Sequence, residues 1–248
     1  MKQNPFLIRL LIVSNLALLS FVVFILLSSF GKKESENKFK EITAERINIV
    51  NADGTPVIAI SNKQRIANPV MGGKKYPVEV GEGREYMAGM IFFNEAGDEM
   101  GGLIFNSFKM PNGKIAGMGH LSFDRFNDNQ VISLEYNENK NGVRSGLTFY
   151  DRPGDGTFKK SLDLVEETGL KTTTPERRAE INAAFKEMTD KKALGAQRLF
   201  IGSRNETAQV ELKDKKGNVR GRFYVDDKGE AKIEFLNEKG EVYSVFPK

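Results

Sequence analysis

Four-residue segments of the form Asn/Asp-x-x-Gly recur along this 248-residue chain, and they constrain its fold more than any other feature. An Asn or Asp at the first position of a turn accepts hydrogen bonds from the backbone ahead of it, and a Gly at the fourth position adopts a positive φ. Together these residues close a β-hairpin with a type I turn and a bulge. The repeat therefore predicts a series of hairpins. The segments are 51–54, 94–97, 214–217, 226–229 and 237–240.

Runs rich in Ile, Val, Phe and Tyr lie between these turns. Such runs at short, regular intervals are typical of an antiparallel meander, whereas parallel strands need crossovers of a dozen or more residues. We therefore expect a mainly β fold of about thirteen antiparallel strands that forms a barrel, two stacked sheets or a small propeller. The expected strands are 47–50, 57–60, 89–93, 102–106, 117–123, 131–136, 145–150, 158–164, 198–202, 208–213, 219–225, 231–236 and 242–246.

Apolar and polar residues alternate along the last four strands. Residues two apart share a face of a strand, so we expect a buried apolar face and a solvated charged face. The apolar set is Val210, Leu212, Val219, Phe223, Val225, Ile233 and Phe235, and the polar set is Gln209, Glu211, Arg220, Arg222, Lys232 and Glu234. Earlier, 90–93, 102–105 and 131–136 place apolar residues on both faces, which indicates a more deeply buried sheet.

One amphipathic helix is expected at about 175–193. Thr173 and Glu176 have the spacing of a capping box, Pro175 suits a first turn, and Gly195 follows the end. The apolar stripe of this helix has the spacing i, i+3, i+4, i+7, and we expect it to pack against the sheet. The stripe consists of Ile181, Ala184, Phe185 and Met188.

Residues 6–30 form a hydrophobic segment, in which Leu10 to Phe30 carries no charge. A helix of this uncharged part is about 31 Å long, close to the thickness of a bilayer core. The apolar part of a signal peptide is only about 7–15 residues long, so we favour a retained signal-anchor over a cleaved signal peptide. Because basic residues lie on both sides of the segment, the positive-inside rule does not decide its orientation. The short amino-terminal tail favours an extracytoplasmic soluble domain.

The expected organisation is a transmembrane anchor (1–30), a polar stalk (31–45) and a β-rich soluble domain (46–248). The chain has no cysteine and only one histidine, which excludes disulfides, thiolate chemistry and metal sites that need two imidazoles. The net charge is +4, and no basic run has interleaved aromatic residues, so we expect no nucleic-acid binding.

Two loops rich in Asp and Asn, at 124–129 and 151–155, are the candidates for a catalytic or metal site. Carboxylates on adjacent loops can form an acid/base pair or hold a cation, although turn chemistry alone also produces such loops. The side chains concerned are Asp124, Asn127, Asp128, Asn129, Asp151 and Asp155. We expect these loops to be turns, and we assign no catalytic, cofactor-binding or metal-ligating residue and no cofactor.

Three other patterns are interpreted as structural. His120, Ser122 and Asp124 would share one face of a strand, but neighbours two apart lie about 6–7 Å apart, too far for a hydrogen-bonded triad. The segment 137–142 begins like a calcium loop, but Thr148 stands where a bidentate Glu is needed, so we expect a hairpin turn.

The third pattern lies in residues 63–88, which contain glycine pairs that match no phosphate-binding or dinucleotide-binding loop, because no helix-forming stretch follows them. We expect this segment to be a long, irregular and mobile loop. Its Lys74, Lys75 and Arg84 would form a contact surface.

The segments 39–62, 89–105 and 121–130, and the tail that begins at Val210, resemble a group of uncharacterised bacterial membrane-anchored, β-rich proteins. The resemblance covers most of the soluble part. It implies a bacterial source, but it brings no activity, ligand or functional residue.

Three functional hypotheses follow. The first is a non-enzymatic, single-pass membrane protein whose β domain binds or assembles at the cell envelope, with the membrane and an unidentified protein as partners. The second is a hydrolase or metal-dependent enzyme that uses the loops near 124–129 and 151–155; it requires that their carboxylates converge in one cleft. The third is a carrier of an apolar ligand, which requires an enclosed cavity and not a core filled by the phenylalanines. The phenylalanines concerned are Phe92, Phe105, Phe123 and Phe149.

Overall fold

A computed structural model describes residues 5–29, 38–81 and 83–247. The chain divides into two compact units, Met1–Thr43 and Ala44–Lys248. In the first unit, helix α1 covers Pro5–Ser29, and its part Pro5–Leu26 is long and apolar enough to cross a membrane. Residues 38–45 form no helix or strand, whereas Phe30 and the first part of the expected stalk lie outside the described residues.

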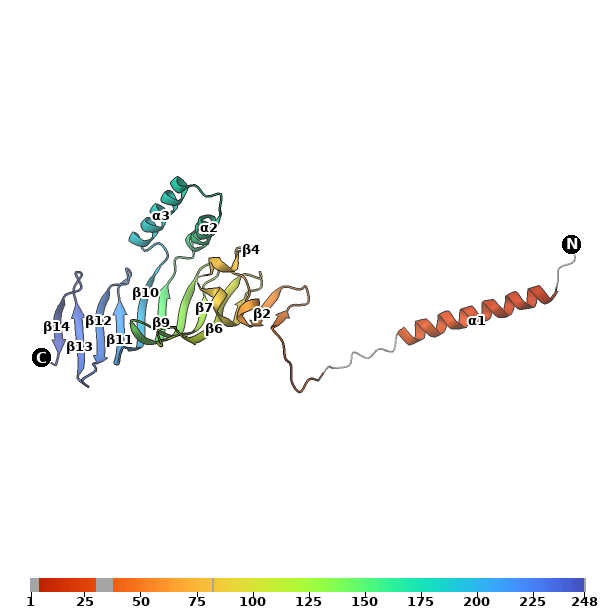
Figure 1. Ribbon diagram of the computed structural model, residues 1–248, viewed down its shortest axis with the longest axis horizontal. Coiled ribbons are helices and arrows are strands. Elements are labelled where there is room, and N and C mark those ends of the chain that lie inside the picture. Colours follow the sequence, from red (N-terminus) through yellow and green to blue (C-terminus); the bar gives the residue numbers. More distant parts are fainter. Residues whose placement is uncertain (1–4, 30–37, 82, 248) are drawn as a thin grey trace. The chain divides into compact units, whose positions relative to one another are not determined.

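The second unit is built on a single antiparallel sheet of twelve strands (Figure 1). Neighbours in the sheet are neighbours in the chain, except where the small hairpin of β3 and β4 intervenes. The prediction of a mainly β antiparallel meander is confirmed. The sheet is open, with β1 and β14 at its edges. The described residues therefore form neither a barrel, nor two stacked sheets, nor a propeller, which were the three predicted arrangements. The strands are β1 (Arg46–Val50), β2 (Pro56–Ser61), β5 (Ala88–Phe93), β6 (Glu99–Lys109), β7 (Ile115–Asp124), β8 (Gln130–Asn139), β9 (Gly142–Asp151), β10 (Ala196–Arg204), β11 (Thr207–Lys213), β12 (Val219–Val225), β13 (Ala231–Leu236) and β14 (Val242–Phe246).

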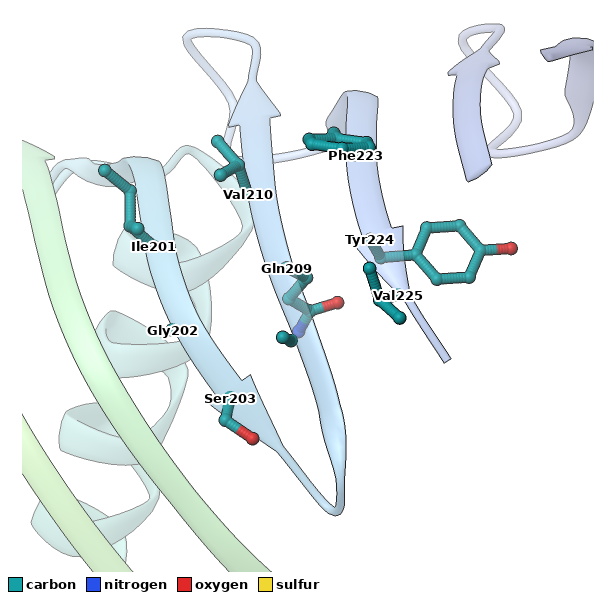
Figure 2. A pocket seen from close by; sticks show the side chains of 9 residues that line it. Ile201, Gly202, Ser203, Gln209, Val210, Phe223, Tyr224 and Val225 are labelled. Atoms are coloured by element: carbon teal, nitrogen blue, oxygen red, sulfur yellow. The ribbon is translucent and has the colours of Figure 1, made fainter. Parts of the chain in front are cut away.

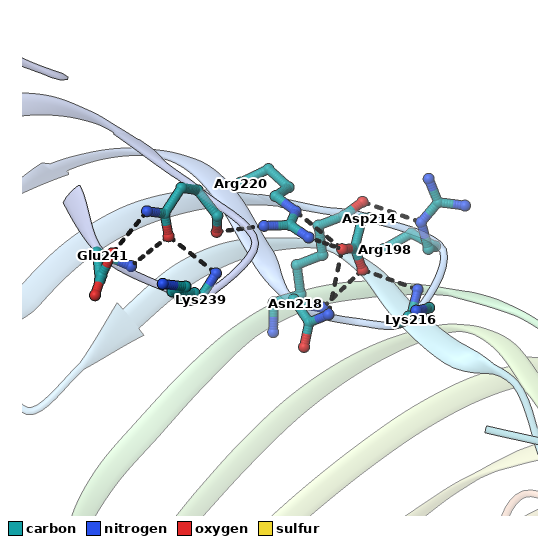
Figure 3. A network of polar contacts seen from close by, with 9 residues as sticks. Arg198, Asp214, Lys216, Asn218, Arg220, Lys239 and Glu241 are labelled. Atoms are coloured by element: carbon teal, nitrogen blue, oxygen red, sulfur yellow. Dashed lines mark hydrogen bonds and ion pairs between the residues drawn. The ribbon is translucent and has the colours of Figure 1, made fainter. Parts of the chain in front are cut away.

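The predicted Asn/Asp-x-x-Gly turns are confirmed by hydrogen bonds from the fourth residue to the first. The amide of Gly217 donates to Asp214 O at 2.9 Å, and the amide of Gly240 donates to Asn237 O at 3.1 Å. The fourth-position glycines of the five turns have φ between 77° and 88°. Figure 3 shows how Arg220 joins these two turns, because its guanidinium donates to the Asp214 carboxylate at 2.6 Å and also to the Asn237 carbonyl.

Two helices, α2 (Thr157–Gly169) and α3 (Pro175–Asp190), lie between β9 and β10 in the chain. The predicted strand at 158–164 is therefore wrong. Phe158 and Leu162, four residues apart, lie on one side of α2, where they pack against a buried cluster. That cluster comprises Met71, Tyr76 and Val80.

The one predicted helix, at about 175–193, is confirmed as α3, with two corrections. Its cap is Thr174, whose hydroxyl accepts a hydrogen bond from Arg177 N at 3.2 Å, and not Thr173. Its apolar stripe packs against α2 and not against the sheet, because Ile181 and Met188 form a buried cluster with Leu164.

The segment between β2 and β5 is not the predicted irregular contact surface. It contains three short 3-10 turns, Lys63–Arg65, Val78–Val80 and Arg84–Tyr86, and the hairpin of β3 (Val70–Met71) and β4 (Lys74–Lys75). Of the three basic residues predicted to form this surface, two are paired with acidic residues of the domain, whereas Lys75 is exposed. The ammonium of Lys74 lies 2.7 Å from Asp163 of α2, and the Arg84 guanidinium lies 2.5 Å from Glu99 of β6.

The strand register gives the sheet two different faces. The first is here called the packed face, and most members of its central row of cross-strand partners are buried. The segment 63–88 covers the part of this face that β2 and β5 form, where Ile66 and Ala67 pack against Ala59 and Ile91. The buried members of this row are Ala59, Ile91, Gly102, Ser122, Ser133, Thr148, Phe200, Glu211 and Glu234.

The second face, here called the open face, carries a central row in which all twelve strands contribute an apolar residue. The row is Ile47, Ile60, Met90, Leu103, Leu121, Leu134, Leu147, Ile201, Val210, Phe223, Ile233 and Phe246. The predicted alternation of the last four strands is confirmed, but the predicted burial is reversed. Leu212 on the open face is 58% exposed, whereas Glu211 on the packed face is 5% exposed.

The earlier strands follow the same division. In 90–93, Ile91 and Phe93 are buried on the packed face, so both faces are apolar as predicted. In 131–136 the prediction holds only in part, because Val131 is the one apolar residue on the packed side, where Ser133 and Glu135 also lie.

Candidate functional site

The open face is apolar beyond its central row. One flanking row is Ile49, Ile58, Phe92, Gly101, Phe123, Ile132, Phe149, Leu199, Leu212, Gly221, Phe235 and Ser244. The other is Ala88, Phe105, Gly119, Tyr136, Ser145, Ser203, Ala208, Val225 and Ala231. None of these residues is charged.

Large side chains on the open face remain in contact with solvent. Leu134, in the middle of the sheet, is 54% exposed, and Phe223 is 51% exposed. The rings of Phe92 and Phe123 stack with their centroids 6.2 Å apart, yet Phe123 is still exposed. Exposed apolar patches larger than a few hundred Å² are rare on monomeric proteins and mark interaction surfaces.

Two shallow apolar hollows lie next to each other on the open face and share Gly202 and Ser203. The first has a volume of about 410 Å³, and Ile201, Val210 and Phe223 stand around it (Figure 2). The second has a volume of about 570 Å³ and includes Gly119, which has no side chain to fill the space. Projecting phenylalanines and hollows thus occur on the same surface.

The structure brings together part of the two Asp/Asn loops. The Asp128 carboxylate is 1% exposed and accepts hydrogen bonds from the amides of Gly154 at 2.6 Å and Asn129 at 2.7 Å. It therefore ties the 151–155 loop to the 124–129 loop. Asp151 instead pairs with Arg198, and Asp155 is exposed and accepts from the Thr157 amide. Only part of the predicted carboxylate set converges.

Asp124 has the most perturbed carboxyl group of these loops. Burial raises its pKa to about 7, and the nearby charge of Glu99 acts in the same direction. The charges of His120, Arg152 and Arg84 oppose this shift. Its Oδ1 atom is buried and accepts no hydrogen bond from the described residues.

The raised pKa predicts a pH-dependent stability. The pKa of Asp124 is about 7 in the folded state, above the value of 3.8 expected in the unfolded state. Its contribution to the free energy of unfolding is therefore fully present below pH 3.8 and is lost as the pH rises through 7. Asp124→Asn should therefore match the wild type at pH 4 and be more stable by about 2 kcal/mol at pH 8, since partial exposure reduces the full effect. Urea unfolding between pH 4 and 9 measures this difference.

Asp155→Asn is the matched control. Hydrogen bonds from Thr157 lower the pKa of Asp155, so its substitution should give no gain at pH 8. A gain from Asp124→Asn that stays the same at all pH values would contradict the assignment of the buried charge.

His120 belongs to a polar network on the packed face and not to a triad. Its Nδ1 lies 3.5 Å from Glu135 Oε1, which also accepts from the Ser133 hydroxyl at 2.8 Å. The hydrogen bond with His120 lowers the pKa of Glu135 to about 2, and those with Arg144 and Ser133 add to the effect. These contacts link β7, β8 and β9, so they support a structural role for His120.

The segment 137–142 forms the hairpin between β8 and β9, as predicted, with Asn139 opposite Gly142. A third hollow, of about 680 Å³, lies beside the turns of Figure 3. Its Asp214 and Arg220 are paired with each other at 2.6 Å. No group of three His, Asp or Glu residues is placed to hold a metal ion in the part of the chain that the structure describes.

Sequence reasoning identifies the side chains of the open face in the last four strands but assigns them to a buried core. It does not identify Glu99 or Glu135, and it assigns Arg84 to a contact surface and not to the ion pair with Glu99. No local pattern predicts these contacts, because each one joins residues that are distant in the sequence or lie on different strands.

Comparison with protein-family models and with curated proteins finds no match for this chain.

Proposed function

We propose that this chain is a non-enzymatic, single-pass membrane protein whose β domain assembles with another protein surface at the cell envelope. The observation that carries the proposal is the central row of the open face, which is apolar on all twelve strands. In this proposal α1 is the signal-anchor and the β domain lies outside the cytoplasm.

The chemistry of the open face favours a folded apolar surface as the occupant over a small ligand. Ligand pockets usually bury about 70–90% of their ligand, and they place a few polar groups to orient it. The open face has no enclosing wall, and its two hollows expose almost only apolar atoms. The carrier hypothesis requires an enclosed cavity, and its four phenylalanines line the open face. The carrier is therefore the weaker proposal.

The enzyme hypothesis remains a second proposal because of one observation, the buried carboxyl group of Asp124 beside Glu99. A raised pKa is a property of many acid catalysts. Turnover of substrates in a hydrolase panel by the full-length protein, lost in Asp124→Ala but not in Asp155→Ala, would support it.

Shielding of the open face in native membranes tests the leading proposal. The chain has no cysteine, so single cysteines can be placed on both faces of β8. Leu134→Cys lies on the open face and Asn137→Cys on the packed face, and both positions are exposed in the single chain. We expect Leu134→Cys to react at least about ten times more slowly with a maleimide, because an occupant excludes the reagent.

The two rates should become equal in urea, which controls for intrinsic reactivity. Equal rates in native membranes would contradict the proposal that the face is occupied. The side of the membrane on which the domain lies is tested by comparing two reactions of Asn137→Cys with a membrane-impermeant maleimide, one in intact cells and one in inverted vesicles. Reaction in intact cells places the domain outside the cytoplasm, and reaction only in inverted vesicles places it inside.

A further inference from the structure

We infer that the occupant of the open face is a second copy of this chain, packed sheet against sheet as a two-fold symmetric dimer. This inference rests on the proposed function, since it names the partner of the same face.

The first argument is the area of the face. With strands about 4.8 Å apart, the twelve-stranded central row is about 53 Å long, and three rows about 6.7 Å apart cover a width of about 20 Å. Each copy would thus bury about 1,000 Å², and a dimer about 2,000 Å² in total, which is the size of a stable protein interface.

The second argument is electrostatic. A two-fold interface places the same patch on both copies, so each charged residue near the axis meets its own like charge. The three rows of the open face carry no charge, and self-pairing therefore has no such cost. The packed face carries Glu211, Arg222 and Glu234 in a single row and lacks this property.

The third argument is shape. Aligned sheets pack about 10 Å apart, with side chains of the two inner faces interdigitating. The open face has exposed phenylalanines that project, among them Phe105 and Phe223, and hollows beside Gly119 and Ser203 with room for side chains. A face with both features can fit a second copy of itself.

The position of Leu134 makes a test independent of the unknown axis. A two-fold axis that relates two sheets packed face to face lies in the plane between them. A residue at the centre of the face lies near its own counterpart for any direction of this axis in that plane, as long as the axis passes over the centre. Leu134 lies in the central row on β8, the sixth of twelve strands, and so meets this condition.

Cross-linking of full-length protein in native membranes tests the inference. Facing backbones about 10 Å apart are too distant for a direct disulfide, so a short bifunctional thiol reagent is needed. Because an occupied face slows thiol reactions, the reagent is kept at low concentration until Leu134→Cys has reacted completely, so that its second end reacts with the facing copy. We expect Leu134→Cys to give a covalent dimer in most of the protein and Asn137→Cys to give none, at equal expression. Two differently tagged copies of Leu134→Cys should appear in the same product.

The other outcomes separate the two proposals. If Leu134→Cys gives no homodimer but is still shielded from maleimide, a different protein or lipid covers the face, which overturns the second copy but not the assembly function. If it gives no homodimer and reacts as fast as Asn137→Cys, both proposals fail.

Discussion

Phe200→Ala should lower the free energy of unfolding by about 3–5 kcal/mol, because it removes a fully buried aromatic side chain and leaves a cavity. Phe200 lies on the packed face of β10 and is 0% exposed. The guanidinium groups of Arg144 and Arg204 lie 4.5 Å and 5.1 Å from its ring centroid. These contacts would also be lost, with their cation–π contribution.

Phe223→Ala is the matched control for this substitution. It removes the same side chain from the open face, where Phe223 is 51% exposed, and should cost about 1 kcal/mol at the lowest protein concentration. Urea unfolding of the full-length chain in detergent micelles, followed by circular dichroism, measures both variants. If Phe223→Ala were as destabilising as Phe200→Ala at every concentration, the open face would be part of the core of the single chain.

The turns and strands of this fold could be predicted because their chemistry is local. An Asx residue at the first turn position and a Gly with positive φ at the fourth act within four residues, as Asp214 and Gly217 do. Alternation along β11 to β13 also depends only on the two-residue period of a strand. These signals predict the order and the approximate bounds of the strands.

Burial could not be predicted in the same way, because it depends on which face other segments cover. The alternation around Glu211 and Leu212 gives two faces but does not say which one is exposed. Hydrophobic character favours the face of Leu212 as the core. In the structure, the packed face buries Glu211, and the charged ends of Arg204 and Lys213 lie 3.4 Å and 3.2 Å from its carboxylate oxygens.

The α2 segment shows a different limit. Its residues 158–164 favour a strand in the sequence because they continue a series of regularly spaced strands. The contacts that stabilise the helix come from Tyr76 and Val80, about 80 residues earlier in the chain. The network of Asp124 and Glu99 is equally non-local, since the two residues lie at the ends of neighbouring strands β6 and β7.

The largest expected effect on assembly comes from charges placed in the central row. Leu134→Arg combined with Ile201→Arg should abolish the dimer, because burial of one unpaired charge costs several kcal/mol. A loss of only about 3 kcal/mol of binding free energy already weakens association more than 100-fold. Both positions are exposed in the single chain, so its own unfolding should change little. The control is Asn137→Arg, which adds a charge on the packed side of the same strand. Co-purification of two differently tagged full-length copies measures the dimer, and circular dichroism checks the fold. Retention of the dimer by a folded double-Arg variant would show that the central row is not the interface. Sheets packed about 10 Å apart would bury the introduced arginines away from water and without partners, and such burial is too costly for a stable dimer.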